Sequence, residues 1–162
     1  MARRTFAVSH AKYNHDMASK SITTEVHIEA TPERVWHILT DLDRYPEWNP
    51  FITQASGQLA EGGRLSIQAG GMAFKPVVRV YRPSQELQWL GSLWFRGLFD
   101  GAHRFELVPQ SDGTTLLRHS EDFSGLLVGL LASKLDRDTR AGFVAMNEAL
   151  KARAETMDVP TE

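Results

Sequence analysis

Hydrophobic and polar residues alternate along the first regular segment of the chain, Ser21 to Glu29. Ile22, Val26 and Ile28 share one parity, whereas His27 has the other. A period of two residues is typical of a strand with one buried face. The pattern therefore predicts a half-buried strand and places His27 toward solvent.

The next segment carries the signals of a short helix followed by a rigid connector. Thr31 suits the N-cap and Pro32 the first helical position, and apolar residues follow at helical spacing. We expect this helix to end near Thr40. Pro46 and Pro50 then restrict the backbone, so the connector has room for at most one more helical turn.

Short apolar runs separated by turn residues fill the chain from Phe51 to Phe123. This spacing predicts an antiparallel meander of about six strands. The alternation assigns to its covered face Leu65, Ile67, Phe74, Val78, Val80, Leu87, Trp89, Leu93, Phe105, Leu107, Leu117 and Phe123. The opposite, hydrated face carries Lys75, Arg79, Gln88, Arg104, Glu106, Arg118 and Asp122.

A long amphipathic helix is predicted near the carboxyl end, where apolar or small residues recur every three or four positions. They are Leu131, Leu135, Gly142, Phe143, Met146 and Leu150. A glycine within a helix costs about 1 kcal/mol relative to alanine, so Gly142 indicates a close neighbour. A curved sheet around one helix encloses more volume than the helix fills. We therefore expect a cavity between them.

Composition narrows the fold and the possible functions. The 162 residues are 42% hydrophobic and suit one domain, which we place at residues 21–156, between a basic arm (1–20) and a tail (157–162). The absence of cysteine excludes thiolate metal sites and thiol nucleophiles. The net charge of −2 argues against nucleic-acid binding. Neither a nucleotide-binding glycine motif nor a serine-hydrolase elbow is present.

The amino-terminal arm and the apolar runs indicate where in the cell we expect the protein. The arm is rich in arginine and lysine but lacks the apolar stretch of a secretory signal, and Met17 is a possible natural start. The longest apolar run, Leu126 to Ala132, is far shorter than the roughly 20 residues of a membrane-spanning helix. We expect a cytoplasmic protein without a membrane span, as a monomer or weak homodimer.

The order of these elements, with the segments Ala30 to Trp36 and Tyr45 to Phe51, resembles the START-like SRPBCC superfamily and particularly its polyketide cyclase/dehydrase branch. Segments 87–89, 99–105 and 119–125 also fit that group, and the resemblance extends from about Ser21 to Glu155. It implies an α+β helix-grip fold, in which a curved antiparallel sheet of about seven strands wraps around a long C-terminal helix. Two short helices would follow the first strand.

The resemblance also implies a class of function. Members of the superfamily hold hydrophobic molecules such as lipids, sterols, polyketides or aromatic hormones in a deep cavity. They include enzymes, carriers, receptors and assembly factors, so the fold alone does not decide the activity. The superfamily does not generally use this cavity for metal, and we predict no cofactor.

Three ionisable residues are predicted on the apolar face of the sheet. The parity that buries Phe105 also turns His103 inward, and the parity that buries Leu117 turns His119 and Glu121 inward. A three-residue turn, 111–113, places His103 opposite Glu121 and His119 on the diagonal. A register shifted by two residues would instead pair the two histidines. Either register keeps the three side chains clustered.

Four interpretations of this cluster are open, because an unpaired carboxylate in an apolar wall is costly. The cluster is a structural hydrogen-bond network, a polar anchor for an apolar ligand, an acid–base catalyst for enolisation or dehydration, or a metal site with two histidines and one carboxylate. We rank metal binding last, since no second shell of residues is recognisable.

These patterns lead us to predict a protein that binds a small hydrophobic molecule in an internal cavity. A cyclase- or dehydratase-like enzyme that uses His103, His119 and Glu121 is the first alternative, and a protein-assembly factor is the second. The candidate ligand contacts are Trp89, Gly91, His103, Phe105, Leu117, His119, Glu121, Phe123, Phe143 and Met146.

Overall fold

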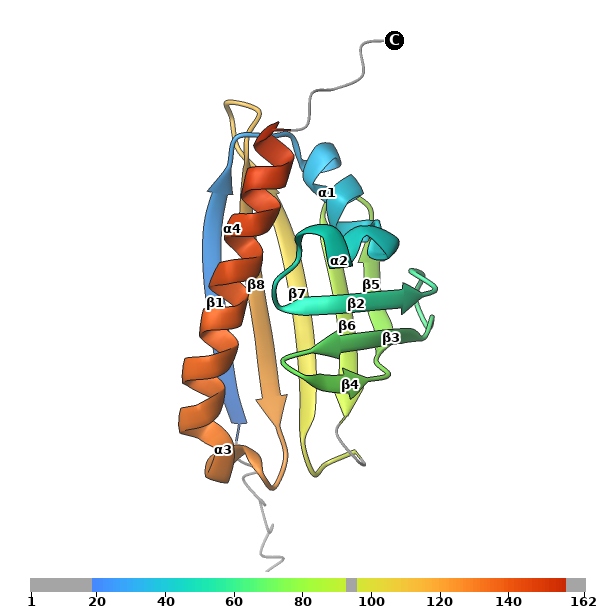
Figure 1. Ribbon diagram of the computed structural model, residues 1–162, viewed down its shortest axis with the longest axis vertical. Coiled ribbons are helices and arrows are strands. Elements are labelled where there is room, and N and C mark those ends of the chain that lie inside the picture. The colour runs from blue at the N-terminus through green and yellow to red at the C-terminus, as the bar shows by residue number, and fades with distance from the viewer. Residues whose placement is uncertain (1–18, 93–95, 157–162) are drawn as a thin grey trace, which may run out of the picture.

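Residues 19–92 and 96–156 are described in the computed structural model, which shows an antiparallel sheet beside a long C-terminal helical segment (Figure 1). The predicted arm and tail lie outside these residues, except that Ser19 and Lys20 already belong to the first strand. Eight strands lie in the described residues: β1 (Ser19–Ile28), β2 (Ile52–Gly57), β3 (Leu65–Ala69), β4 (Met72–Phe74), β5 (Val77–Arg82), β6 (Glu86–Ser92), β7 (Asp100–Pro109) and β8 (Thr115–Ser124).

The two short helices form where the capping and proline signals predict them. α1 is Pro32–Thr40, and its N-cap hydroxyl, Thr31 Oγ1, accepts a hydrogen bond from Arg34 N–H. A 3₁₀ turn, η1 (Leu42–Arg44), leads into α2 (Tyr45–Trp48). α2 is a single turn, which agrees with the expectation of at most one more helical turn in the connector.

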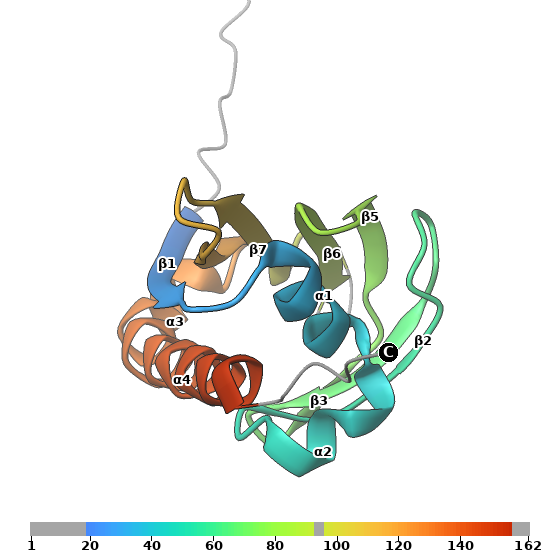
Figure 2. The same cartoon turned by 90° about the horizontal axis from the view of Figure 1, so that it is seen from above.

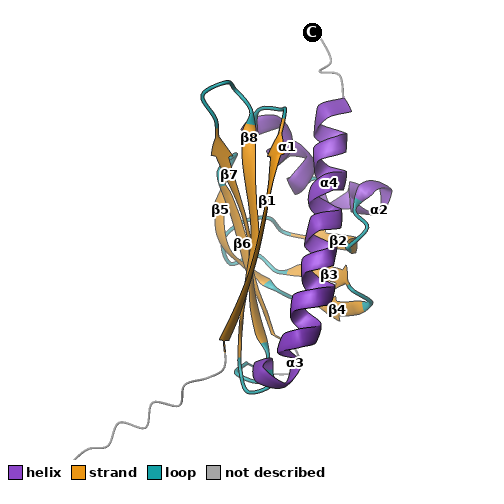
Figure 3. Ribbon diagram, turned by 90° about the vertical axis from the view of Figure 1, so that its left-hand side faces the viewer, coloured by secondary structure: helices purple, strands orange, loops and turns teal. Residues whose placement is uncertain are grey.

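The strands form two sheets, whereas the sequence pattern predicted one sheet of about seven strands. Five strands pair in the order β1-β8-β7-β6-β5, and three pair in the order β2-β3-β4. Backbone hydrogen bonds join the sheets where Leu65 N–H donates to Pro76 O and Val78 N–H donates to Gly63 O. The smaller sheet lies with the C-terminal helix on the same side of the larger sheet (Figures 2 and 3). The antiparallel helix-grip architecture is confirmed.

One predicted inward residue of the meander points the other way. A register shift between Val78 and Val80 makes Val80 the partner of Gln88, on the outer face, and Tyr81 the partner of Leu87. A bulge of this kind reverses the parity of every following residue, which alternation alone does not reveal. Leu93, which was predicted to be inward, lies outside the described residues.

The C-terminal helical segment contains a change of helix type that its hydrophobic pattern did not predict. It comprises α3 (Val128–Lys134), a π-helical segment η2 (Leu135–Thr139) and α4 (Arg140–Thr156). π-helical turns are often found at functional sites. No helix within the described ranges combines the length and the apolarity that crossing a membrane requires.

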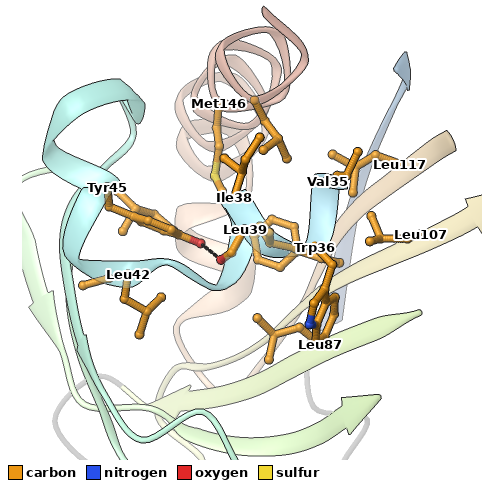
Figure 4. Close-up of a cluster of buried hydrophobic side chains, with 14 of the residues drawn as sticks. Val35, Trp36, Ile38, Leu39, Leu42, Tyr45, Leu87, Leu107, Leu117 and Met146 are labelled. Atoms are coloured by element: carbon orange, nitrogen blue, oxygen red, sulfur yellow. Dashed lines mark hydrogen bonds between the residues drawn. The ribbon is translucent and has the colours of Figure 1, made fainter. Parts of the chain in front are cut away.

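The packed core lies where α1 covers the sheet (Figure 4). Tyr45 is wholly buried there, and its hydroxyl donates a hydrogen bond of 2.7 Å to Leu39 O. Burial raises the pKa of this hydroxyl above its ordinary value. The side chains around it include Val35, Trp36, Leu42, Leu87, Leu107, Leu117 and Met146.

Candidate functional site

Two glycines leave part of the sheet without side chains. Gly91 on β6 and Gly101 on β7 are directly paired, so neither strand covers the surface at this point. A Cβ added at Gly101 would collide with the Glu121 carboxylate, and one added at Gly91 would lie an ordinary 3.7 Å from Pro76 Cβ. The two glycines, with the Glu121 carboxylate over Gly101, form the floor of a cavity.

The cavity has a volume of about 490 Å³ and a predominantly apolar wall. Residues from the larger sheet, the smaller sheet and the C-terminal helical segment form this wall. They are Phe51, Ile52, Ile67, Ala69, Gly70, Met72, Phe74, Pro76, Trp89, Gly91, Phe99, Gly101, His103, Glu121, Phe123, Leu131, Lys134, Asp138 and Thr139.

Half of the predicted ligand contacts lie on this wall, namely Trp89, Gly91, His103, Glu121 and Phe123. The other five predicted contacts, Phe105, Leu117, His119, Phe143 and Met146, are not among the lining residues but belong to the buried interior. For Phe105, Leu117 and His119, strand parity shows the inward face correctly, and helical spacing does the same for Phe143 and Met146. Strand parity does not show where along the strand the packed interior ends and the cavity begins.

The ionisable residues come together in the predicted register. His103 pairs with Glu121 and Phe105 pairs with His119, and Gly113 in the turn has the expected positive φ of 85°. This register places His119 diagonally from His103. The alternative with the two histidines directly opposite is wrong.

Hydrogen bonds connect the cluster in one chain. Glu121 Oε2 lies 3.3 Å from His103 Nδ1, and His103 Nε2 lies 2.8 Å from His119 Nε2. His119 Nδ1 in turn lies 2.8 Å from Asn147 Oδ1 on α4. Asn147 Nδ2 donates to Thr24 Oγ1, and Thr24 Oγ1–H donates to the backbone oxygen of His119. We call this series, from Glu121 to Thr24, the polar chain.

Aromatic packing holds the two imidazole rings in place. Trp89 stacks on His103 with ring centroids 4.9 Å apart, and Phe143 stacks on His119 at 3.8 Å. His119 is fully buried. Burial and the neighbouring His103 lower the pKa of His119 well below its ordinary value, so this imidazole is neutral near neutral pH.

Glu121 is the more exposed of the two members of the polar chain that line the cavity. Its side chain is 17% exposed, compared with 6% for His103. Because Oε2 contacts His103 and Oε1 lies over Gly101, the carboxylate presents its second oxygen to the cavity floor. A carboxylate in this position can accept a hydrogen bond or a proton from a bound molecule.

Three residues of the candidate site, Asn147, Lys134 and Asp138, were not predicted from the sequence. Asn147 had a readable signal, because it is a polar residue at helical spacing from Phe143 and Leu150, on the buried face of the helix. Lys134 and Asp138 had none, since a charged helical residue is ordinarily solvated, yet both of these lie on the cavity wall.

The close neighbour predicted for Gly142 is an aromatic ring. A Cβ at this position would collide with the ring of Phe51, which also packs edge-on against Phe143 at 5.7 Å. Phe51 is a wall residue of the cavity. Gly142 therefore lets α4 approach the segment before β2 and helps to shape the cavity wall.

The cluster of His103, His119 and Glu121 does not have the arrangement of a metal site. Among the residues that the structure describes, no group of three histidine, aspartate or glutamate side chains is arranged to hold a metal ion. The two histidine Nε2 atoms contact each other, and the remaining His119 nitrogen contacts Asn147.

The family described as polyketide cyclase / dehydrase and lipid transport matches residues 19–155. The chain belongs to this family. Sequence comparison with curated proteins gave no match. The family match confirms the resemblance noted in the sequence for nearly the whole of the described chain.

Solved structures of the same fold have low sequence identity to this family member. A START superfamily protein from Mycobacterium smegmatis is 22% identical, with a TM-score of 0.67, and the match covers 85% of this chain and 99% of that one. Norcoclaurine synthase from Thalictrum flavum, in complex with dopamine and hydroxybenzaldehyde, is 12% identical, with a TM-score of 0.69 and coverage of 98% and 100%. The di-domain ARO/CYC StfQ from the steffimycin biosynthetic pathway is 13% identical, with a TM-score of 0.70 and coverage of 85% and 51%.

Proposed function

We infer that the protein binds a small, mainly apolar molecule in the cavity and orients it by a polar contact with Glu121. The observation that carries this function is the combination of a 490 Å³ cavity and one polar chain that opens onto its floor. Ligand pockets are typically 300–1,000 Å³, mostly apolar, and contain a few polar groups that fix the orientation of the ligand.

The family supports the same conclusion at a coarser level. Its description joins cyclase and dehydrase activity with lipid transport, and each of these requires an apolar molecule to be enclosed. The related norcoclaurine synthase structure holds dopamine and hydroxybenzaldehyde, both small aromatic molecules. A small aromatic molecule is therefore a suitable first probe, and naphthalene is one that lacks any polar group.

The test is a calorimetric titration of the full chain with naphthalene. Gly91→Val extends a branched side chain from the floor into the cavity and should abolish binding. Gln88→Val changes the opposite face of the same strand and should leave binding unchanged. Equal binding by the wild type and Gly91→Val would contradict this function.

Acid–base catalysis is a second candidate, favoured by the hydrogen-bonded chain behind the Glu121 carboxylate. A carboxylate backed by an imidazole can remove a proton next to a ketone and return it during enolisation. The probe is 2-tetralone, whose hydrogen–deuterium exchange in D₂O is followed by NMR. Glu121→Gln should abolish catalysed exchange, and His27→Ala, on the outer face, should not change it. Exchange that is the same in Glu121→Gln and wild type would exclude this role.

A further inference from the structure

We propose that Asn147 is a positioning residue that fixes the proton arrangement of the polar chain, so that Glu121 and His103 share a single proton and the site selects an uncharged ligand with a hydroxyl donor. A phenol or an enol has this chemistry. The inference rests on the proposed function, because it names the class of ligand that the same cavity takes.

The proton arrangement of the polar chain can be traced from the backbone oxygen of His119, which accepts hydrogen bonds and cannot donate them. Thr24 Oγ1 donates its hydrogen to this oxygen at 3.3 Å. The hydroxyl oxygen of Thr24 then accepts from Asn147 Nδ2, which lies 2.9 Å away. This orients the amide so that its oxygen, Oδ1, faces His119.

The orientation of the amide decides the tautomer of His119. Since Asn147 Oδ1 accepts, His119 must carry its hydrogen on Nδ1. His119 is buried and neutral, so its Nε2 has a lone pair and no hydrogen. The 2.8 Å contact between the two Nε2 atoms is then a hydrogen bond that His103 donates and His119 accepts.

The tautomer of His119 leaves one proton for the contact between His103 and Glu121, at the end of the polar chain. His103 uses its Nε2 hydrogen on His119, so a single further hydrogen lies between His103 Nδ1 and Glu121 Oε2, 3.3 Å apart. A hydrogen bond between these two atoms requires that hydrogen, either on an imidazolium facing a carboxylate or on a carboxylic acid facing an imidazole. In both forms the pair has no net charge, and Glu121 Oε1 remains an acceptor.

This acceptor determines which ligands suit the cavity. Within the described part of the chain Oε1 of Glu121 has no hydrogen-bond donor, and it lies over the floor at Gly101. A ligand hydroxyl can donate to it. A ligand carboxylate would bring a second acceptor against it and lose its own hydration. The other charged lining residues, Lys134 and Asp138, have opposite signs, so the wall has no excess of positive charge for an anion.

The ligand preference can be measured with three probes of one size: naphthalene, 2-naphthol and 2-naphthoate. Near neutral pH, 2-naphthol should bind the wild type about tenfold or more tightly than naphthalene, and 2-naphthoate should bind more weakly than 2-naphthol. Glu121→Leu should remove the preference for 2-naphthol while naphthalene still binds. Equal binding of 2-naphthol and naphthalene, or tighter binding of 2-naphthoate, would overturn the inference. Failure of all three probes would count against the proposed function instead.

The role of Asn147 has its own spectroscopic test. The ¹⁵N shifts of labelled histidine in the wild type should show His119 with its hydrogen on Nδ1, and a hydrogen on Nε2 would overturn the assignment without any variant. Asn147→Asp, whose carboxylate can only accept, should preserve the Nδ1 hydrogen. Asn147→Leu, which removes the acceptor, should move the hydrogen to Nε2. A fold defect alone would not produce this pair of opposite results.

Discussion

The two ends of strands β6 and β7 differ in what their inward faces carry. At one end Leu87 pairs with Phe105, and both side chains are fully buried in the core beneath α1. Four residues further along β6, Gly91 pairs with Gly101 and the same face is bare. The pairing of β6 with β7 continues without a register shift between these two points. The difference shows that the hollow on this face begins where β6 and β7 carry glycine instead of a larger residue.

The polar chain marks the boundary between the packed end and the hollow end. Trp89 and His103 are paired between the Leu87 and Gly91 positions, and their rings stack. His103 faces the cavity, whereas His119, one step behind it, is enclosed by the core. A buried polar series between two apolar regions needs every member paired, and the contacts from Glu121 to Thr24 supply that pairing.

The largest expected effect is the loss of stability from truncation at the packed end. Phe105→Ala should lower the free energy of unfolding by about 3–5 kcal/mol, because a fully buried ring is removed from a filled core. Phe74→Ala, in a half-buried residue of the cavity wall, should cost much less, since its ring already borders empty space. Urea unfolding of both variants measures the contrast. Similar losses would show that the hollow end is as tightly packed in solution as the core.

Much of the difference between the packed end and the hollow end could be predicted from the sequence, because strand alternation and turn length are local properties. Alternation fixed the inward parity of His103, His119 and Glu121, and the short turn at Gly113 set their register. The extent of the cavity was not readable, since it depends on how β3, β4 and the helical segment close over the floor. The paired glycines were visible as residues, but only the register between β6 and β7 places Gly91 beside Gly101.

The second prediction concerns the floor at Gly101. Gly101→Ala should lower the free energy of unfolding by about 1–3 kcal/mol, because the added methyl group collides with the Glu121 carboxylate and displaces it. The displaced carboxylate should also lose its contact with His103. Urea unfolding and the titration with 2-naphthol measure the two effects. An unchanged preference for 2-naphthol over naphthalene in this variant would contradict the placement of Glu121 as the anchor.

A third prediction uses the depressed pKa of His119 to compare folded and unfolded chains. The unfolded imidazole binds a proton near pH 6.5, whereas the folded one does so only at much lower pH. Its contribution to stability is therefore complete above about pH 6.5 and is lost as the pH falls below that value. The slope is at most about 1.4 kcal/mol per pH unit for this one group.

The measurement is urea unfolding at several pH values between neutral and mildly acidic. His119→Gln should flatten the dependence on pH, because the buried group that titrates only after unfolding is gone. His27→Gln is the matched control, since His27 is exposed on β1 and should leave the slope as in the wild type. A steep slope that persists in His119→Gln would assign the dependence to other groups.

The smallest effect is expected from Gly91→Ala, which separates the two glycines of the floor. Glycine in a strand costs about 0.5–1 kcal/mol relative to alanine, and the added Cβ meets only Pro76 at an ordinary 3.7 Å. The variant should therefore be as stable as the wild type or gain up to about 1 kcal/mol. Because no atom of Glu121 lies within 4 Å of the added Cβ, the preference for 2-naphthol over naphthalene should be kept. The contrary result would be that Gly91→Ala loses as much stability and as much preference for 2-naphthol as Gly101→Ala. That result would show that a side chain at either position disrupts the floor, whether or not it contacts Glu121. The contrast between them depends on Gly101 alone lying beneath the carboxylate.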